Sequence, residues 1–475
     1  MDRCAHRGVD ALPLPLYGLK RAVARQSLSL ALVLIIAALC RIPGLVADVR
    51  FHPDEALYAT FAREILQTND FLLIGRALDK PPLHFFAVAG TFAAIGQSEF
   101  TARLPACFAS LISIAALYAI GQRLYGVRIG LLVALLLAGS PVDRAFAASA
   151  FTDPLLTMFI LLALLASVRG RWSAAGLLCA AAFATKPSAL GWLPLVLLVG
   201  WTAQGSARGT GRGLVAAAVG LALLIAWSIA RDTHPDFWAL NGMNNTPDRL
   251  IRSDEVIPRA AYWLGIVWAA CPLAIAAWVV PLLRPLRTLD RIIAGYAVAV
   301  IGVYWLVAFN TYDRYLLPLV PLLLLMSARL VVALYDYLAR RWRDRVALLA
   351  SAAFVVWMLA PLPVTNASQA GIDDFARDLN ALPAGTIIYE HWLGWELGWY
   401  LGSAPNVRLV WLPSVADLIV EAQCSPVYII GPQDDLAPWL DEMHIRGFVA
   451  RTISTRQHFV LMQVAQPFWY NCRSE

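Results

Sequence analysis

The sequence carries little charge for its length. Only 15% of its 475 residues are charged and 59% are hydrophobic, whereas soluble domains carry about 25% charged residues. A lipid environment explains this balance better than a single water-soluble core does. The net charge of +6 comes from short basic clusters between apolar runs, and no continuous basic face indicates a nucleic-acid partner. The composition therefore predicts an integral membrane protein.

Several signatures of enzymes and metal sites are also missing. The seven cysteines form no CxxC pair and no Cys/His spacing typical of zinc sites. Cys424 and Cys472 fall in the C-terminal part, where either a disulfide or two free thiols fit the sequence. That part also lacks GxGxxG, GxxxxGK[ST] and GxSxG motifs. The N-terminus has no small-residue cleavage site, so we expect its first apolar run to be a permanent span.

Eleven apolar runs approach the length of about 20 residues that crosses a bilayer. They are residues 28–46, 104–124, 129–141, 154–168, 172–185, 189–203, 214–230, 259–282, 292–309, 315–334 and 346–361. A further run, residues 83–96, is only about fourteen residues long, which is typical of an interfacial or re-entrant helix. If this run does not cross, every dense arginine cluster lies on the cytoplasmic side, as the positive-inside rule requires.

The fold class predicted is a polytopic α-helical membrane protein with about 11 spans and a small C-terminal α/β domain. Residues 1–27 are expected in the cytoplasm, and residues 28–362 form the membrane domain with outer loops at 47–103 and 231–258. Residues 363–475 alternate strands with helices, and span parity places them outside the plasma (inner) membrane. Within them, the tryptophan-rich stretch 391–400 resembles a sugar-stacking platform, but a buried seat against the membrane is favoured.

The outer segments collect most of the acidic residues of the membrane domain. Asp54 and Glu55 follow Pro53 at a predicted helix start, where acids also complement the helix dipole. Asp153 lies at the outer end of a later span. Ionisable groups at membrane depth are expensive, so their convergence on one side indicates a reaction site or a pathway.

Cationic residues accompany these acids on the same predicted face. Lys80 precedes two prolines, Arg103 lies at the mouth of the second span, and Lys186 and Arg314 follow in later outer segments. Transfer from a lipid phosphate needs a carboxylate to accept a proton and cations to neutralise the departing phosphate. We expect Lys80, Arg103, Lys186 and Arg314 to bind that phosphate.

Six motifs in this order resemble the GT-C fold glycosyltransferases that use polyprenyl-phosphate sugars. They are PDEALYA (53–59), DKPPL (79–83), EFTARLP (99–105), FTDPL (151–155), TKP (185–187) and RYLLPLVP (314–321). The similarity points to the branch that contains lipid A aminoarabinose transferases and protein O-mannosyltransferases, and it does not extend into the C-terminal part.

The resemblance implies residue roles and partners. It implies Asp54 as base or acceptor-binding carboxylate, Asp153 as a second essential carboxylate and Lys80 as a donor phosphate ligand. The donor is a polyprenyl-phosphate-linked monosaccharide, transferred usually with inversion to a lipid, glycan or protein acceptor. Glu55 is grouped with the catalytic acids. His52, Tyr58 and His84 are expected to position substrate.

Two alternatives to a glycosyltransferase, and the question of a metal, remain open from the sequence. A polytopic transporter or flippase would also concentrate charge, but no internal repeat supports it. A non-catalytic scaffold predicts no clustering of acids with the DKPP element. No cofactor is expected with certainty, although a divalent cation at Asp54 and Asp153 is compatible with the residues. His52 and His84 lack a third close ligand, which favours packing over zinc binding.

Overall fold

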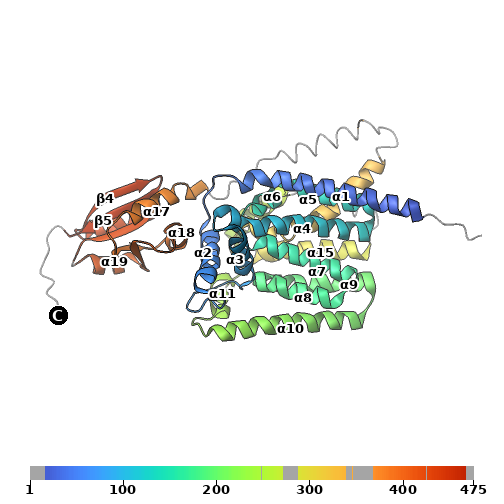
Figure 1. The fold of residues 1–475 in the computed structure, drawn as a ribbon, viewed down its shortest axis with the longest axis horizontal. Coiled ribbons are helices and arrows are strands. Elements are labelled where there is room, and N and C mark those ends of the chain that lie inside the picture. The colour runs from blue at the N-terminus through green and yellow to red at the C-terminus, as the bar shows by residue number, and fades with distance from the viewer. Residues whose placement is uncertain are drawn as a thin grey trace, which may run out of the picture.

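The structure, a computed structural model, describes residues 16–247, 249–270, 287–337, 345, 367–423 and 425–466. A bundle of helices occupies one end of the molecule, and a smaller domain with a β-sheet occupies the other (Figure 1). The predicted span 346–361, most of the arginine cluster before it, and Cys424 and Cys472 lie outside the described residues.

Helices form at ten of the eleven predicted spans. They are α1 (Leu16–Leu45), α4 (Glu99–Tyr125), α5 (Val127–Gly139), α7 (Asp153–Val168), α8 (Trp172–Thr185), α9 (Leu193–Gln204), α10 (Ala207–Arg231), α12 (Val256–Ala270), α15 (Thr288–Leu306) and Val320–Tyr337. In the described part of the chain, five helices are long and apolar enough to cross a membrane. The number becomes six if α5 and α6 (Pro141–Ala147), bent by 61°, form one span. The expected count of about eleven is therefore met only in part, because helices such as α7 and α8 are short, and because the predicted span 346–361 and residues 271–282 of the span 259–282 lie outside the described residues.

Two helices lie across the end of the bundle next to the smaller domain: α2 (Pro53–Thr68) and α3 (Leu83–Ile95) (Figure 1). Helix α2 begins in a capping box, in which His52 Nδ1 accepts from the Asp54 amide and Glu55 accepts from the His52 amide. Helix α3 has 13 residues, which span about 20 Å. The run 83–96 thus forms a short helix set crosswise to the spans.

The C-terminal domain is a five-stranded sheet with helices on both faces. Its strands are β1 (Thr386–Glu390), β2 (Val407–Trp411), β3 (Val427–Pro432), β4 (Val449–Arg456) and β5 (Phe459–Ala465), in the order β2-β1-β3-β5-β4. Strands β2, β1 and β3 run parallel to one another, and β5 pairs antiparallel with both β3 and β4. The helices are α17 (Ile372–Asn380), α18 (Gly394–Tyr400), α19 (Val415–Ala422) and α20 (Gln433–Ile445). Strands and helices therefore alternate along this part of the chain, as expected from the sequence.

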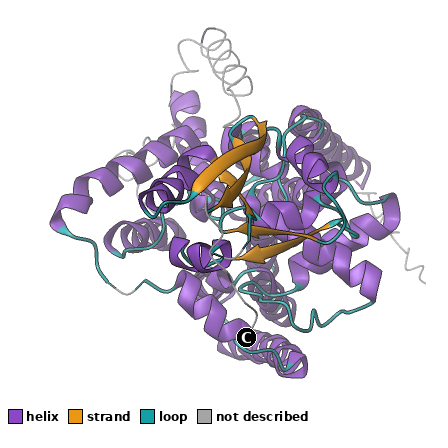
Figure 2. Cartoon of the chain, turned by 90° about the vertical axis from the view of Figure 1, so that its left-hand side faces the viewer, coloured by secondary structure: helices purple, strands orange, loops and turns teal. Residues whose placement is uncertain are grey.

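Alternating side chains build one hydrophobic core on each face of this sheet. Ile388 and Ile430 join Phe375 of α17 on one face, whereas Tyr389 and Ile429 lie in the core of the other face. This period of two is what a sheet covered on both sides requires. Viewed from the side of the C-terminal domain, the strands lie in front of the helical bundle (Figure 2).

Helix α18 seats the C-terminal domain on α2 and α3. The Trp399 ring contacts Phe51 edge-on at 5.4 Å and stacks on Phe92 of α3 at 5.7 Å. The Tyr400 hydroxyl accepts from the Phe51 amide at 2.7 Å. Arg63 of α2 donates to the Trp399 carbonyl at 3.0 Å, near the end of α18. The second half of the tryptophan-rich stretch therefore forms a seat that packs on α2 and α3 of the protein itself.

Candidate functional site

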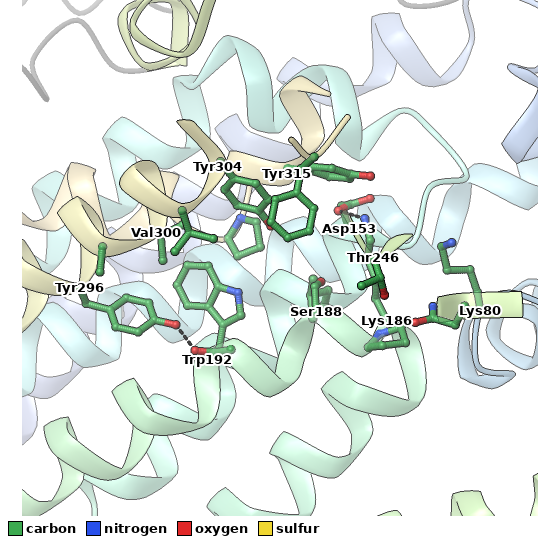
Figure 3. A pocket seen from close by; sticks show the side chains of 18 residues that line it. Lys80, Asp153, Lys186, Ser188, Trp192, Thr246, Tyr296, Val300, Tyr304 and Tyr315 are labelled. Carbon is green, nitrogen blue, oxygen red and sulfur yellow. Dashed lines mark hydrogen bonds and ion pairs between the residues drawn. The ribbon is translucent and has the colours of Figure 1, made fainter. Parts of the chain in front are cut away.

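A cavity of about 520 Å³ is lined by the start of α7, the segment that follows α8, and α15. Its charged end is formed by Lys80, Asp153 and Lys186 (Figure 3). The opposite end is lined by apolar and aromatic side chains, among them Trp192, Tyr296, Val300, Val303 and Tyr304. The cavity is thus amphipathic along its length. A ligand that joins an anionic group to an apolar body would match it.

The centre of the charged end is an ion pair between Lys186 and Asp153. Lys186 Nζ donates to Asp153 Oδ1 at 2.7 Å, and both side chains are buried. Asp153 begins α7, where the helix dipole favours a carboxylate. Lys186 ends α8, and Pro187 turns the chain there into a short 3₁₀ helix, Pro187–Trp192. Among the described residues, the buried Asp153 Oδ2 has no hydrogen-bond partner, so this carboxylate can still accept.

A second ion pair joins Asp54 to Arg314. Arg314 Nη2 donates to Asp54 Oδ2 at 2.9 Å. The guanidinium lies 4.6 Å from the Phe151 ring centroid and 4.3 Å from that of Tyr312. Arg314 also interacts electrostatically with Asp153. The two pairs therefore adjoin, although their members come from four separate segments.

Lys80 completes the cationic group. It forms an ion pair with the neighbouring Asp79 and interacts electrostatically with Lys186. The Asp79 carbonyl accepts from Asn241 Nδ2 at 2.7 Å, which links the DKPP element to helix α11 (Phe237–Asn245). Three cations of the sequence motifs, each paired with a carboxylate of the motifs, are therefore gathered in one place. Two of the three cations, Lys80 and Lys186, line the cavity itself.

Glu55 and His84 lie away from the cavity and hold the backbone that precedes Asp153. The Ala150 amide donates to Glu55 Oε1 at 2.6 Å. The Ala150 carbonyl accepts from His84 Nε2 at 2.7 Å. Both side chains are fully buried. The two peptide groups on either side of the Ala150 Cα, three residues before Asp153, are thus held by side chains of α2 and α3.

Arg103 is not brought to the cavity. Its Nη2 donates to the Val49 carbonyl at 2.7 Å, and its Nε lies 3.9 Å from Glu55 Oε1. The guanidinium lies 5.2 Å from the Phe51 ring centroid, beneath the seat of the C-terminal domain. Only 2% of the residue is exposed. The structure therefore places Arg103 in an internal contact, apart from Lys80 and Lys186.

His52 and Tyr58 border the Asp54 pair. The His52 ring lies 5.1 Å from the Phe151 ring, and burial lowers the pKa of its imidazole, which Asp54 offsets in part. Tyr58 is buried, with its ring 5.5 Å from that of His84. Both residues therefore shape the wall beside Asp54.

Several residues that line the cavity were not predicted from the sequence, because they belong to no local motif. Asn241 is an ordinary amide in the loop 231–258, and Trp192, Tyr296 and Tyr304 lie within apolar runs. Aromatic residues in a membrane span are common, so only their convergence identifies them as lining residues.

Within the described ranges, no three His, Cys, Asp or Glu side chains gather as a metal site. Asp54 and Asp153 are each paired with a side-chain cation. A divalent cation at these carboxylates stays an untested prediction.

Comparisons with known proteins give one family and several structures. Residues 79–229 match the model of the dolichyl-phosphate-mannose-protein mannosyltransferase family. No curated protein sequence matches the chain. ArnT from Cupriavidus metallidurans in the apo state is similar over 93% of this chain and 98% of that chain, with 17% identity and a TM-score of 0.64. The same enzyme bound to undecaprenyl phosphate is similar over 91% and 97%, with 17% identity and a TM-score of 0.63.

A more distant structure shares the same architecture. The oligosaccharyltransferase AglB from Archaeoglobus fulgidus, in complex with an inhibitory peptide and a dolichol-phosphate, is similar over 91% of this chain and 74% of that chain. Its sequence identity is 11% and its TM-score 0.54. The resemblance to GT-C membrane glycosyltransferases is therefore confirmed. At these low identities the structures show a shared fold.

Proposed function

We propose that the chain is a membrane glycosyltransferase that moves a monosaccharide from a polyprenyl-phosphate donor to a lipid, glycan or protein acceptor at the outer face of the inner membrane. The observation that carries this proposal is the amphipathic cavity, which has two lysines at one end and an aromatic, apolar wall at the other. The fold shared with ArnT, which has been captured with undecaprenyl phosphate, supports the same donor class.

The donor phosphate fits the lysine end of this cavity. Lys80 and Lys186 are both more than 90% buried, and a buried cation binds a phosphate more strongly than an exposed one does. Each lysine is paired with a neighbouring carboxylate, so an arriving phosphate would share or replace these partners. The apolar wall then accommodates the lipid or the less polar face of the sugar.

In the proposed transfer with inversion, each charged group has its own role. An acceptor hydroxyl or amine attacks the anomeric carbon, and the bond between that carbon and the phosphate oxygen breaks. The acceptor proton passes to the Asp54 carboxylate, and the bonding electrons leave with the polyprenyl phosphate. Lys80, Lys186 and Arg314 stabilise the phosphate charge, which grows in the transition state. Asp153 orients Lys186 through Oδ1, and its Oδ2 accepts a hydrogen bond from the acceptor.

Two substitutions test these roles, because they should impair different steps of the reaction. Asp54→Asn should bind donor and turn over about 10² to 10⁴ times more slowly, the typical loss of general-base help. Lys80→Ala should weaken donor binding as well as turnover, since the phosphate is charged in both states. The control is Arg128→Ala, because this arginine is 82% exposed and pairs with Asp336 outside the cavity lining.

Donor affinity and single-turnover rate should be measured on all variants with a labelled polyprenyl-phosphate sugar in detergent. Release of polyprenyl phosphate by the parent chain is expected from an enzyme, whereas a transporter leaves the donor intact. Parental turnover in Asp54→Asn, or parental donor affinity in Lys80→Ala, would contradict the assigned roles. A scaffold without activity is already disfavoured by the clustering of Asp54 and Asp153 with Lys80.

A further inference from the structure

The first half of the tryptophan-rich stretch belongs to an aromatic cluster separate from the seat of α18. We define the aromatic cluster as His391, Trp392, Trp411 and Trp439. The His391 ring stacks on Trp411 at 5.8 Å and 17°, and lies 5.0 Å from Trp392 and 5.1 Å from Trp439. Trp392 and Trp439 contact each other at 5.0 Å. Three chain segments that are distant in sequence thus bring four rings together.

The aromatic cluster lies where parallel sheets commonly bind ligands. His391 and Trp392 follow β1, Trp411 ends β2, and Trp439 lies on α20, which follows β3. The order β2-β1-β3 reverses direction at β1. In open α/β sheets, ligands bind outside the carboxyl ends of the strands at such a switch point. Helix α18, which follows His391 and Trp392 directly, rests on α2 (Figure 1).

Trp411 leaves one ring face open to solvent. The residue is 59% exposed and belongs to neither core of the C-terminal domain. One of its faces is covered by His391, so the exposed area must come largely from the opposite face. Trp392 is held in place from below, because it packs so closely that a Cβ at Gly431 would lie 2.8 Å from its ring. The aromatic cluster is therefore a rigid base carrying one open ring.

Polar groups accompany the aromatic cluster at the carboxyl ends of the strands. His391 Nδ1 donates to the Leu412 carbonyl at 2.6 Å, which leaves Nε2 as an acceptor. Asp434 and Asp435 are exposed in the first turn of α20, at the same edge of the sheet. The C–H face of a sugar ring is attracted by the negative face of an aromatic ring, while its hydroxyls need polar partners at the rim. A sugar offers both features at once.

We propose that the aromatic cluster is a carbohydrate-binding platform, on which sugar rings of a glycan-bearing acceptor stack against Trp411. Only the identification of this glycan as the acceptor rests on the proposed function. Binding of the sugar by itself does not. Glu396, five residues after His391, interacts electrostatically with Asp54. The domain that carries the platform therefore lies against α2, the helix that carries the carboxylate assigned to the acceptor.

The test uses the full chain in nanodiscs, without any donor. Saturation-transfer-difference NMR is recorded with maltohexaose, cellohexaose and chitohexaose as probes, on the parent and on Trp411→Ala, Trp411→Phe and Trp395→Ala. Trp395 is the matched control, because it is 53% exposed in the same domain and lies outside the aromatic cluster. We expect at least one hexasaccharide to bind, Trp411→Ala to weaken that binding about tenfold, and Trp411→Phe and Trp395→Ala to retain most of it.

Three results would overturn the platform. The first is no saturation transfer from the parent to any of the three sugars. The second is equal binding by Trp411→Ala and the parent. The third is quenching of Trp411 fluorescence by a lipid in the nanodisc that carries a spin label on its headgroup. The Trp411 fluorescence is the difference between the parent and Trp411→Phe. Such quenching would mean that the aromatic cluster contacts the membrane. Donor turnover is measured separately, so a failure of the platform is distinct from a failure of the glycosyltransferase proposal.

Discussion

Glu396 makes the docking of the C-terminal domain sensitive to pH. It lies on α18, is only 2% exposed, and its Oε2 has no hydrogen-bond partner among the described residues. Burial raises the pKa of this carboxyl to about 7, and the nearby charges of Glu390 and Asp54 add to the rise, while its own backbone amide opposes it. The folded protein therefore holds a proton on Glu396 at pH values where an exposed glutamate has lost it.

The direction in which stability changes with pH follows from this raised pKa. When α18 is exposed to water, the Glu396 pKa returns to about 4.5. Between about pH 4.5 and 7 the folded state binds more protons than the unfolded state, so the free energy of unfolding falls as pH rises. Each tenfold change in the acid constant is worth about 1.4 kcal/mol, so the full loss by pH 8 is about 3 kcal/mol.

The measurement is the denaturation midpoint of the C-terminal domain in the full chain, followed by tryptophan fluorescence in detergent from pH 5 to pH 8. The parent should lose stability across this range, and Glu396→Gln, which carries no titratable proton, should lose much less. Asp54→Asn should show an intermediate loss, because one of the two repelling charges is removed. Glu442→Gln is the control, since Glu442 is an exposed acid of α20 in the same domain. Identical pH dependence in the parent and Glu396→Gln would refute the reasoning.

Three further predictions follow from the seat, the backbone clamp and the topology. Trp399→Ala should weaken the docking free energy of the C-terminal domain by about 3 to 5 kcal/mol and speed limited proteolysis between the two domains. Substitution of the exposed Trp395 by alanine should do neither, and equal cleavage of the two variants would argue against the seat. His84→Phe leaves the buried Ala150 carbonyl without its hydrogen bond, which should lower stability by about 1 to 3 kcal/mol. The variant should slow single turnover more than it weakens donor binding. Turnover at the parental rate would exclude a positioning role for His84. A reporter that fluoresces only in the cytoplasm, fused after residue 475, should stay dark, and bright fluorescence would overturn the predicted orientation.

Local patterns in the sequence account for the helices and strands. Hydropathy places ten helices where spans are expected, because an apolar run satisfies its own backbone hydrogen bonds within a helix. The strand around Ile388 and Tyr389 lies where the sequence alternates strands with helices, and the structure shows it buried on both faces. Such features depend on residues a few positions apart, so they can be deduced without knowledge of the tertiary structure. The bend between α5 and α6 and the shortness of α7 and α8 are the points where span length alone misleads.

The sequence alone also determined which residue types could carry the chemistry, since six ordered motifs placed carboxylates and cations on one predicted face. The tertiary structure decided how they pair. Lys186 and Asp153 are separated by 33 residues and Arg314 and Asp54 by 260, and no local pattern encodes contacts at such distances.

Packing likewise decided roles for chemically similar residues. Glu55 is next to Asp54 in the chain, yet the turn of α2 directs it into the interior, where it holds Ala150. The same tryptophan-rich stretch supplies a seat through Trp399 and an exposed cluster through His391, because the two lie on opposite sides of the start of α18. Composition and spacing define the candidates, but burial and orientation, which depend on the whole fold, define what each one contacts.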